Sequence, residues 1–401
     1  MSLHATLTHI ENPGPLSLSK SLSSLFVGLI VIGALAFVGG VLTEPVRAWQ
    51  NYIQDMFMFT GLALGGYVFV AINRAVNSHW AIVPRRLAEA FTSFLPIAGV
   101  LFLISLVGIK MVGPEIYSWL GDHSGIISPT KHKWLNFNMM AIRNALFFVI
   151  WILVARKLVN YSLAQDDGQN SELTPKANRF GITALLLFAP TFAFFSYDFL
   201  MSMEPKWYST MFSVYTFAGI FQSTLALMVI VFVKLKNNQL KDVATPSHVK
   251  DISGLLFAFT VFMCYVGFSQ FMLIWYANLP EEVFYYLKRA DGGWLVIAYL
   301  TWFFKFILPF FGLLGQGQKK HSLWLMIVCW GVLIGQWLDI YWMSMPANHT
   351  EFVMVSWIEV GTLAMFAGLF GFVVSRWMTK HSLIPAGDPL VLESANWRFW
   401  E

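Results

Sequence analysis

Long apolar runs separated by short polar segments form the pattern of this chain. Each run has about 18 residues or more, enough to cross a bilayer core of roughly 30 Å. The runs lack the apolar–polar alternation of a membrane β-strand. The pattern therefore predicts an all-α polytopic membrane protein. Its ten predicted spans cover residues 21–42, 55–75, 87–109, 134–157, 180–201, 209–234, 251–275, 294–314, 323–343 and 352–375.

Two short segments near span ends resemble each other. Asp198 precedes a Met-Ser-Met sequence and a nearby proline, and Asp339 precedes the same combination four spans later. Parallel repeats are known in membrane proteins. We therefore expect a single membrane domain, 1–401, built from two four-helix bundles. Its parts are 21–54 (first span and outer loop), 55–201 (first bundle, spans 2–5), 209–343 (second bundle, spans 6–9), 352–375 (last span) and 376–401 (cytoplasmic tail).

Composition agrees with this class, because 57% of the residues are hydrophobic and only 12% are charged. Soluble domains carry about 25% charged residues. Most of the 26 Lys and Arg residues lie in the tails and in the loops on one side of the predicted spans. The positive-inside rule places that side, with both termini, in the cytoplasm. The net charge of +4 is therefore interpreted as a topology signal, and no nucleic-acid partner is expected.

Histidine and cysteine provide no evident ligand set for a metal or haem. By our span assignment all nine histidines fall in tails or loops, and Cys264 and Cys329 lie singly inside apolar runs. Haem inside a helical bundle usually needs axial side chains from within the spans. Neither cysteine belongs to a CxxC or CxxCH pattern. No redox cofactor or metal is therefore expected on this chain.

Ionisable residues inside the spans are the main candidates for function. Placing Arg, Lys or Asp in a span costs about 2.5–3.5 kcal/mol on insertion scales, so each needs a partner or a task. Arg143 and Lys305 are expected near mid-membrane, and Asp198 and Asp339 near the outer ends of their spans. We expect the pairs Asp198–Arg143 and Asp339–Lys305. Proton conduction and structural ion pairing both remain open for these four residues.

Glu359 lies about seven residues inside the last predicted span, without an evident partner nearby. It is a candidate proton carrier, or a structural hydrogen-bonding group. Asn136 is expected to share a helix face with Arg143, and Glu204 to shape the turn after the fifth span. Gln270 is a weaker polar candidate, and Glu89 is assigned to a solvated inner end.

An outer segment with mixed charges and aromatics separates spans 7 and 8. It reads "NLPEEVFYYLKRADGGW" over Asn278–Trp294. The mixture is typical of an interfacial amphipathic helix. A docking surface for a partner subunit is the alternative.

Two stretches of the chain carry a family resemblance. "SYDFLMSMEPKWYSTMFSVYTFAG" (Ser196–Gly219) and "NLPEEVFYYLKR" (Asn278–Arg289) resemble the smaller polysulfide-reductase-like, NrfD-type membrane subunit of bacterial alternative complex III. That assembly is a quinol:cytochrome c oxidoreductase of the inner membrane. The resemblance implies ten spans in two four-helix bundles, with no redox centre on this subunit. It places haem c and iron–sulfur clusters on partner subunits.

The same resemblance implies partners: a related larger NrfD-type subunit, an iron–sulfur subunit, c-type cytochromes and, in some assemblies, a terminal oxidase. We expect a cofactor-free subunit of a quinol-oxidising respiratory complex that supports menaquinone or ubiquinone binding and moves protons. Asp198, Asp339 and Glu359 would be the acids, and Arg143 and Lys305 would tune them. No catalytic residue is assigned. The alternatives are a secondary transporter and a purely structural membrane anchor.

Overall fold

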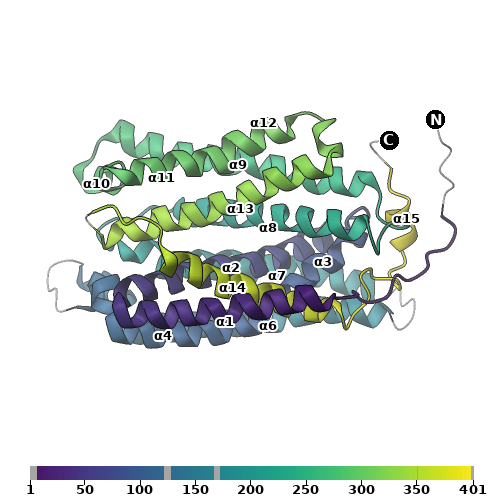
Figure 1. Ribbon diagram of the computed structural model, residues 1–401, viewed down its shortest axis with the longest axis horizontal. Helices are drawn as coiled ribbons and strands as arrows, with labels where there is room; N and C mark the ends of the chain where they lie inside the picture. Colours follow the sequence, from purple (N-terminus) through teal and green to yellow (C-terminus); the bar gives the residue numbers. More distant parts are fainter. Residues whose placement is uncertain (1–6, 122–127, 167–171, 350, 399–401) are drawn as a thin grey trace.

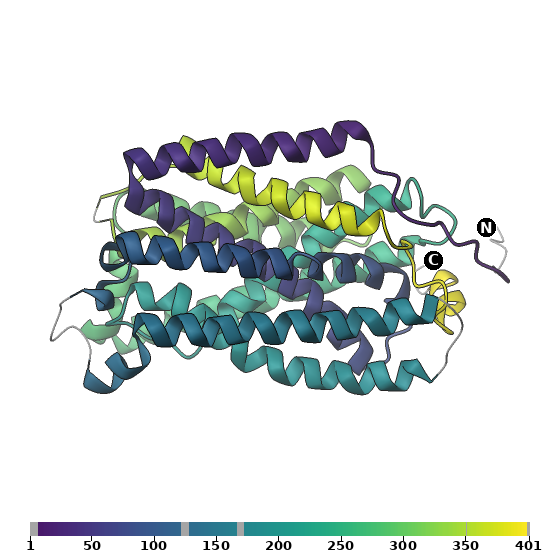
Figure 2. The same cartoon turned by 90° about the horizontal axis from the view of Figure 1, so that it is seen from below.

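The computed structural model describes residues 7–121, 128–166, 172–349 and 351–398 of the 401. Within these ranges the chain is helical and contains no β-strand. Ten segments are long and apolar enough to cross a membrane. The long helices run roughly side by side along one axis (Figures 1 and 2). The predicted all-α polytopic class with ten spans is therefore confirmed.

The first group of helices packs around α2. Its long members are α2 (Pro45–Ala75), α3 (Ile82–Thr92), α4 (Leu95–Ile116), α6 (Phe137–Asp166) and α7 (Leu173–Phe199). Short elements at its ends are η1 (Ser118–Leu120), α5 (Pro129–Trp134) and η2 (Met201–Met203). Helices α3 and α4 together form one span, interrupted between Thr92 and Leu95.

The second group packs around α8 and α13. Its long members are α8 (Phe212–Lys236), α9 (Pro246–Ala277), α11 (Gly293–Trp302), α12 (Leu308–Leu314) and α13 (Ser322–Ser344). Short elements are α10 (Pro280–Arg289), η3 (Phe303–Ile307), η4 (Gln318–Lys320) and η5 (Met345–Ala347). The segment η3 is one π-helical turn that joins α11 and α12 into a single span. The two groups meet where α2 packs on α8 and α13.

Helices α1 (Lys20–Thr43) and α14 (Trp357–Met378) form a pair outside both groups, and α14 packs on α2. Small residues allow this pair to approach closely: a Cβ added at Gly33 of α1 would lie 2.5 Å from the carbonyl oxygen of Gly361. Small residues at helix contacts are typical of membrane proteins. The outward face of α1 is largely exposed, as expected for a span that borders lipid.

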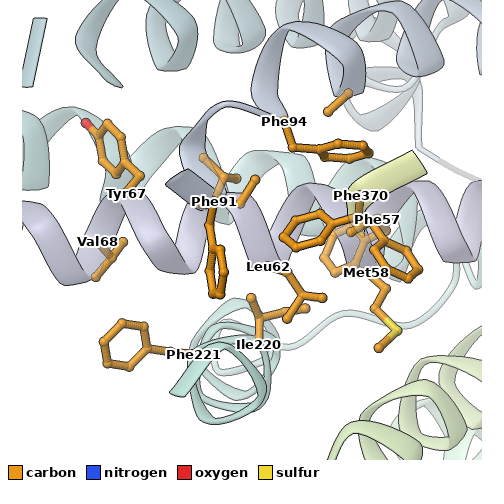
Figure 3. Close-up of a cluster of buried hydrophobic side chains, with 14 of the residues drawn as sticks. Phe57, Met58, Leu62, Tyr67, Val68, Phe91, Phe94, Ile220, Phe221 and Phe370 are labelled. Atoms are coloured by element: carbon orange, nitrogen blue, oxygen red, sulfur yellow. The ribbon is translucent and has the colours of Figure 1, made fainter. Parts of the chain in front are cut away.

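Helix α2 is the centre of the molecule, with 94% of its most apolar window buried. Phe57 and Leu62 of α2 lie in a cluster with side chains from α3, α8 and α14, including Phe91, Ile220 and Phe370 (Figure 3). A helix that is surrounded on all sides must be apolar all round. The polar residues near the start of α2 are therefore the informative exceptions.

The helix bundle has two ends (Figure 1). The end that carries α10 is called the α10 end. The opposite end carries α15 (Val391–Ala395) and both the first and the last described residues, and is called the tail end. An even number of spans places the two termini at the same end.

Helix α2 begins ten residues earlier than the sequence pattern predicted. Residues 45–54 are helical, so their assignment to an outer loop was wrong. Pro45 occupies the first turn of α2 directly after Glu44, where its missing N–H and fixed φ suit a helix start. The connection between α1 and α2 is consequently a single sharp turn, and α2 carries an additional polar stretch.

Candidate functional site

Arg143 of α6 and Asp198 of α7 form a bidentate ion pair. Nε of Arg143 donates to Oδ2 of Asp198 at 2.9 Å, and Nη2 donates to Oδ1 at 2.6 Å. The amide of Asn144 also donates to Oδ2 at 2.7 Å. Asp198 is fully buried, so the pair supplies its charge with a partner inside the protein. The pairing expected from the sequence is present.

Arg143 lies closer to the α10 end than expected. It is about 9 Å along the helix axis from Phe137, the first residue of α6. Its guanidinium stacks over the ring of Trp134 at 3.9 Å. Asn136 does not share in this site, because its side chain accepts from the N–H of Met139 at 2.9 Å and so caps α6. The expected support by Asn136 was wrong, and its place is taken by Asn144.

Lys305 and Asp339 form the second expected pair, inside the second group. Nζ of Lys305 donates to Oδ2 of Asp339 at 2.5 Å, and the hydroxyl of Tyr215 donates to Oδ1 at 2.8 Å. Lys305 and Asp339 are each 1% exposed. Lys305 lies in the π-helical turn η3. Two charges and one hydroxyl therefore form a compact polar centre within an apolar helix group.

The two pairs occupy corresponding places in the two groups. In each group the cation comes from the third span and the aspartate from the fourth. Each cation also lies over an aromatic ring, Arg143 over Trp134 and Lys305 over Tyr215. This repeated arrangement corresponds to the resemblance between the two sequence segments that follow Asp198 and Asp339.

Glu359 is in the first turn of α14, and not deep within a span. Nε and Nη2 of Arg47 donate to its two carboxylate oxygens at 2.6 and 2.9 Å. Asn51 donates at 2.8 Å, and the backbone N–H of Ser356 at 2.7 Å. With Ser356 it forms a capping box at the start of α14. The expected position about seven residues inside the last span was wrong, and the partner Arg47 belongs to the start of α2 that the pattern missed.

Asp55 of α2 is a buried acid that sequence reasoning missed. Its Oδ1 accepts from the indole N–H of Trp337 at 2.9 Å, whereas its Oδ2 has no hydrogen-bond partner in the described part of the chain. Among the described residues no Lys, Arg or His forms an ion pair with it. The hydropathy pattern predicts that the second span begins at residue 55, although Pro45 signals a helix start ten residues earlier.

Polar side chains continue from Asp55 along α2 toward the α10 end. Gln50 donates to the carbonyl of Ser344 at 2.8 Å, and the hydroxyl of Ser344 donates to Gln54 at 3.2 Å. Asn51 then contacts Glu359. These groups lie where α2 meets α13 and α14, so a polar seam runs from Glu359 to Asp55 between the helix groups.

A buried charge cluster lies at the tail end. Arg85 donates to Asp388 at 2.7 Å, and Arg86 lies 2.8 Å from Asp166. Glu89 lies between these arginines, 3.3 Å from Nε of Arg85, and is fully buried. Its assignment to a solvated face was therefore wrong. Burial alone would raise the pKa of Asp388, but the positive charges of Arg85 and Arg74 hold it below its ordinary value.

Glu204 connects the two stretches on which the family resemblance rests. Its Oε1 lies 3.1 Å from Nζ of Lys288 and 3.6 Å from Nη1 of Arg289, both on α10. Trp207 also stacks on Tyr285 of α10 at 3.8 Å. The segment after α7 and helix α10 therefore form one packed cap on the α10 end.

One face of helix α10 is buried against the rest of the protein. Tyr285 and Arg289 are buried, and burial raises the pKa of Tyr285 to about 12. Nη2 of Arg289 donates to the carbonyl of Met343 at 2.8 Å. The predicted helix is present, and these two residues pack against the protein itself.

His248 departs from the expected distribution of histidines. It lies in the first turn of α9, fully buried, where its Nδ1 accepts from the N–H of Thr245 at 3.0 Å. Its assignment to a loop was wrong, because α9 begins at Pro246 instead of residue 251. His4 and His123 lie outside the described residues. In the described part of the chain, no group of three His, Cys, Asp or Glu side chains is arranged to hold a metal ion.

Comparison of the chain with known protein families and with curated proteins does not identify it. No family model matches the chain, and no curated protein is detectably similar to it. The function must therefore be argued from the site itself and from the resemblance of its motifs.

Proposed function

We propose that this chain is a membrane subunit of a quinol-oxidising respiratory complex of the alternative complex III type. In this proposal it carries no redox centre, supports quinone binding and takes part in proton movement. Haem c and iron–sulfur clusters would belong to partner subunits, among them a larger NrfD-type subunit. The resemblance of Ser196–Gly219 and Asn278–Arg289 to that family supports this assignment.

The observation that carries the proposal is the repeated acid–cation pair. A buried ion pair costs desolvation energy that its attraction only partly returns, so it is weak evidence for a stabilising role. Asp198 and Asp339 are both buried, and each is held by a cation from the neighbouring span. Intramembrane acids and bases of this kind mark proton or ion pathways.

A carboxylate held by a cation can take part in proton transfer because its charge is sensitive to its neighbours. A proton that arrives at Asp339 would weaken its attraction to Lys305, and movement of Lys305 would favour proton uptake. The fully buried Asp55, together with Gln50, Gln54 and Asn51, adds further polar groups along α2. These groups provide positions at which protons could be held between the two helix groups.

The proposed location is the bacterial inner membrane. Most of the 26 Lys and Arg residues lie in the tail-end loops, in the tails or in the span turns next to them, and the positive-inside rule places that side in the cytoplasm. The α10 end, with the cap formed by Glu204 and α10, would then face the opposite side. Both termini would be cytoplasmic.

Proton release by the reconstituted complex tests this proposal. We expect Asp339→Asn and Asp198→Asn each to lower the number of protons released per electron during quinol oxidation in proteoliposomes. The matched control is Asp242→Asn, an exposed aspartate between α8 and α9. If both variants assemble and release protons as the control does, proton movement by these residues is excluded. Loss of assembly with normal proton release in the remaining complexes would indicate a structural anchor.

A further inference from the structure

A cavity of about 360 Å³ lies inside the second helix group. Its lining residues come from α8, α9, α10, α11, η3 and α13. The volume falls in the lower part of the range of roughly 300–1,000 Å³ found for small-molecule sites. None of the residues that line it comes from the seam along α2, but Lys305 and Asp339 of the second ion pair lie in its wall.

The cavity reaches the outer surface of the bundle. Phe268 of α9 and Tyr299 and Trp302 of α11 belong to its lining, and their side chains are exposed on the faces of these spans. The surroundings of such faces in a membrane are lipid chains. A molecule dissolved in the bilayer could therefore enter between α9 and α11 without passing through water.

The walls are aromatic and the inner end is polar. Tyr286 and Trp342 provide flat surfaces, while Lys305, Asp339 and Tyr215 form the hydrogen-bonded polar end. Thr301 also lines the cavity, and its buried hydroxyl has no hydrogen-bond partner among the residues that the structure describes. Gln270 is a further polar side chain in the lining, and it is buried, with 7% exposure. Leaving a buried hydroxyl without a partner is unfavourable, and a polar ligand atom would supply the missing hydrogen bond.

The backbone around Lys305 is specialised. The π-helical turn Phe303–Ile307 interrupts α11–α12 at this residue, and such turns are frequent at functional sites. Gly219 of α8 makes room for the side chain: a Cβ there would lie 2.5 Å from Nζ of Lys305 and 2.7 Å from Oε1 of Gln336. The lysine is therefore positioned by local geometry as well as by its ion pair.

We propose that this cavity binds the ring of a quinone-type lipid, with a ring oxygen at the polar end formed by Lys305, Asp339 and Tyr215. The apolar tail would leave between α9 and α11. The flat aromatic walls suit a ring. The polar end suits an oxygen that takes part in a hydrogen bond, and the lipid-facing rim suits an apolar tail. The choice of quinone among such molecules rests on the proposed function; the chemistry of the ligand rests on the cavity. Only binding is proposed.

Native mass spectrometry of the full-length chain in lipid nanodiscs tests the site. The probes are a fully substituted benzoquinone with a ten-carbon tail, and decylbenzene, which has the ring and tail but no ring oxygen. We expect the quinone to bind about tenfold or more tightly than decylbenzene, because its ring oxygens can accept hydrogen bonds from Nζ of Lys305 and from the hydroxyl of Thr301. Equal binding of both probes would show a site for apolar chains only and overturn the proposal.

Two variants on α11 locate the bound molecule. Ala298 lines the cavity, so Ala298→Phe should fill it and weaken quinone binding by about tenfold or more. Val296 is exposed on the same helix and does not line the cavity, so Val296→Phe should bind as the unchanged chain does. If Ala298→Phe binds the quinone as well as Val296→Phe does, the cavity is not the site.

Thr301→Val tests the polar end without removing a charge, because the Thr301 hydroxyl can donate to a ring oxygen, whereas the hydroxyl proton of Tyr215 is already donated to Asp339. The change should weaken quinone binding by about threefold to tenfold while leaving decylbenzene binding unchanged. Equal effects on both probes, or none on either, would contradict the assignment of the ring oxygen.

The binding site and the proposed function can fail independently. If the chain binds the quinone but purifies without redox subunits, the site is supported and the proposed complex is contradicted. If the chain purifies with redox subunits but does not bind the quinone in this cavity, the proposed complex is supported and the site is contradicted.

Discussion

Asp198, Asp339 and Asp55 are three buried aspartates with three different sets of partners. Asp198 has a guanidinium and an amide, Asp339 has an ammonium and a phenol, and Asp55 has an indole N–H alone. The first two carry a counter-charge, and the third has no ion-pair partner in the described part of the chain. The consequences of substitution should differ accordingly.

Removing Arg143 should be costly because it leaves Asp198 charged and buried. Breaking a buried pair from one side costs about 3–5 kcal/mol, so Arg143→Met should lower the free energy of unfolding by this amount. The double variant Arg143→Met with Asp198→Asn should recover most of it. Unfolding in mixed detergent micelles measures the effect, with Arg156→Met, an exposed arginine on the same helix, as control. Equal losses in Arg143→Met and Arg156→Met would show that the pair is not buried as described.

Sequence reasoning reached the two ion pairs but not the partners of Glu359. Arg143 and Asp198 could be matched because each stands alone in an apolar run and the same combination recurs four spans later. Glu359 is held by Arg47, a residue 312 positions away. Gln50, Asn51, Gln54 and Asp55 lower the hydropathy of residues 45–54, so the pattern predicts a loop around Arg47. Only the surrounding helices show that these polar residues belong to the buried start of α2.

At the level of elements, run length predicted the ten spans well, but interruptions inside spans were not visible. The break between α3 and α4 and the π-helical turn η3 both lie within apolar runs. The break between α3 and α4 lies in the second span of the first group, whereas η3 lies in the third span of the second group. Transporters with internal repeats usually interrupt corresponding helices in both halves. The observed interruptions therefore do not favour the transporter alternative.

Packing around η3 predicts opposite effects for two glycines. Gly219→Ala should lower the free energy of unfolding by about 1–3 kcal/mol, because the added methyl group meets Lys305 and Gln336. Gly254→Ala on α9 meets no atom within 4 Å and should stabilise its helix by about 0.5–1 kcal/mol. Thermal unfolding of the two variants in the same detergent compares them. Stabilisation by both changes would mean that α8 and η3 are not in close contact.

The segment after α14 should release from the tail end at low pH. Arg85 and Arg74 depress the pKa of Asp388, so its ion pairs contribute stability above the ordinary value near 3.8 and lose it as pH falls through the lower folded-state value. Asp388→Asn should mimic this release at neutral pH. Hydrogen exchange of residues 379–398 measures it. Glu393→Gln, which affects only an exposed pair with His79, is the control, and equal protection in both variants would contradict the docking role of Asp388.

At the level of the whole molecule, helices from the two groups meet along α2, and the α1–α14 pair covers one side of it. The polar seam from Glu359 to Asp55 follows the contacts of α2, whereas the cavity with Lys305 lies within the second group. The proposed proton-holding groups therefore lie both along α2 and at the polar end of the cavity, where Lys305 and Asp339 would also meet the bound ring. This arrangement fits the proposed subunit, which would assist quinol oxidation by partners that carry the redox centres.

Purification from native membranes under mild detergent tests the central claim most directly. A tagged copy of the chain should be isolated with c-type cytochrome and iron–sulfur polypeptides, identified by mass spectrometry. The preparation should show a haem c difference spectrum that is reduced by quinol. Untagged membranes treated in the same way are the control. A chain that purifies by itself, with no haem spectrum and no quinol-dependent reduction, would contradict the account.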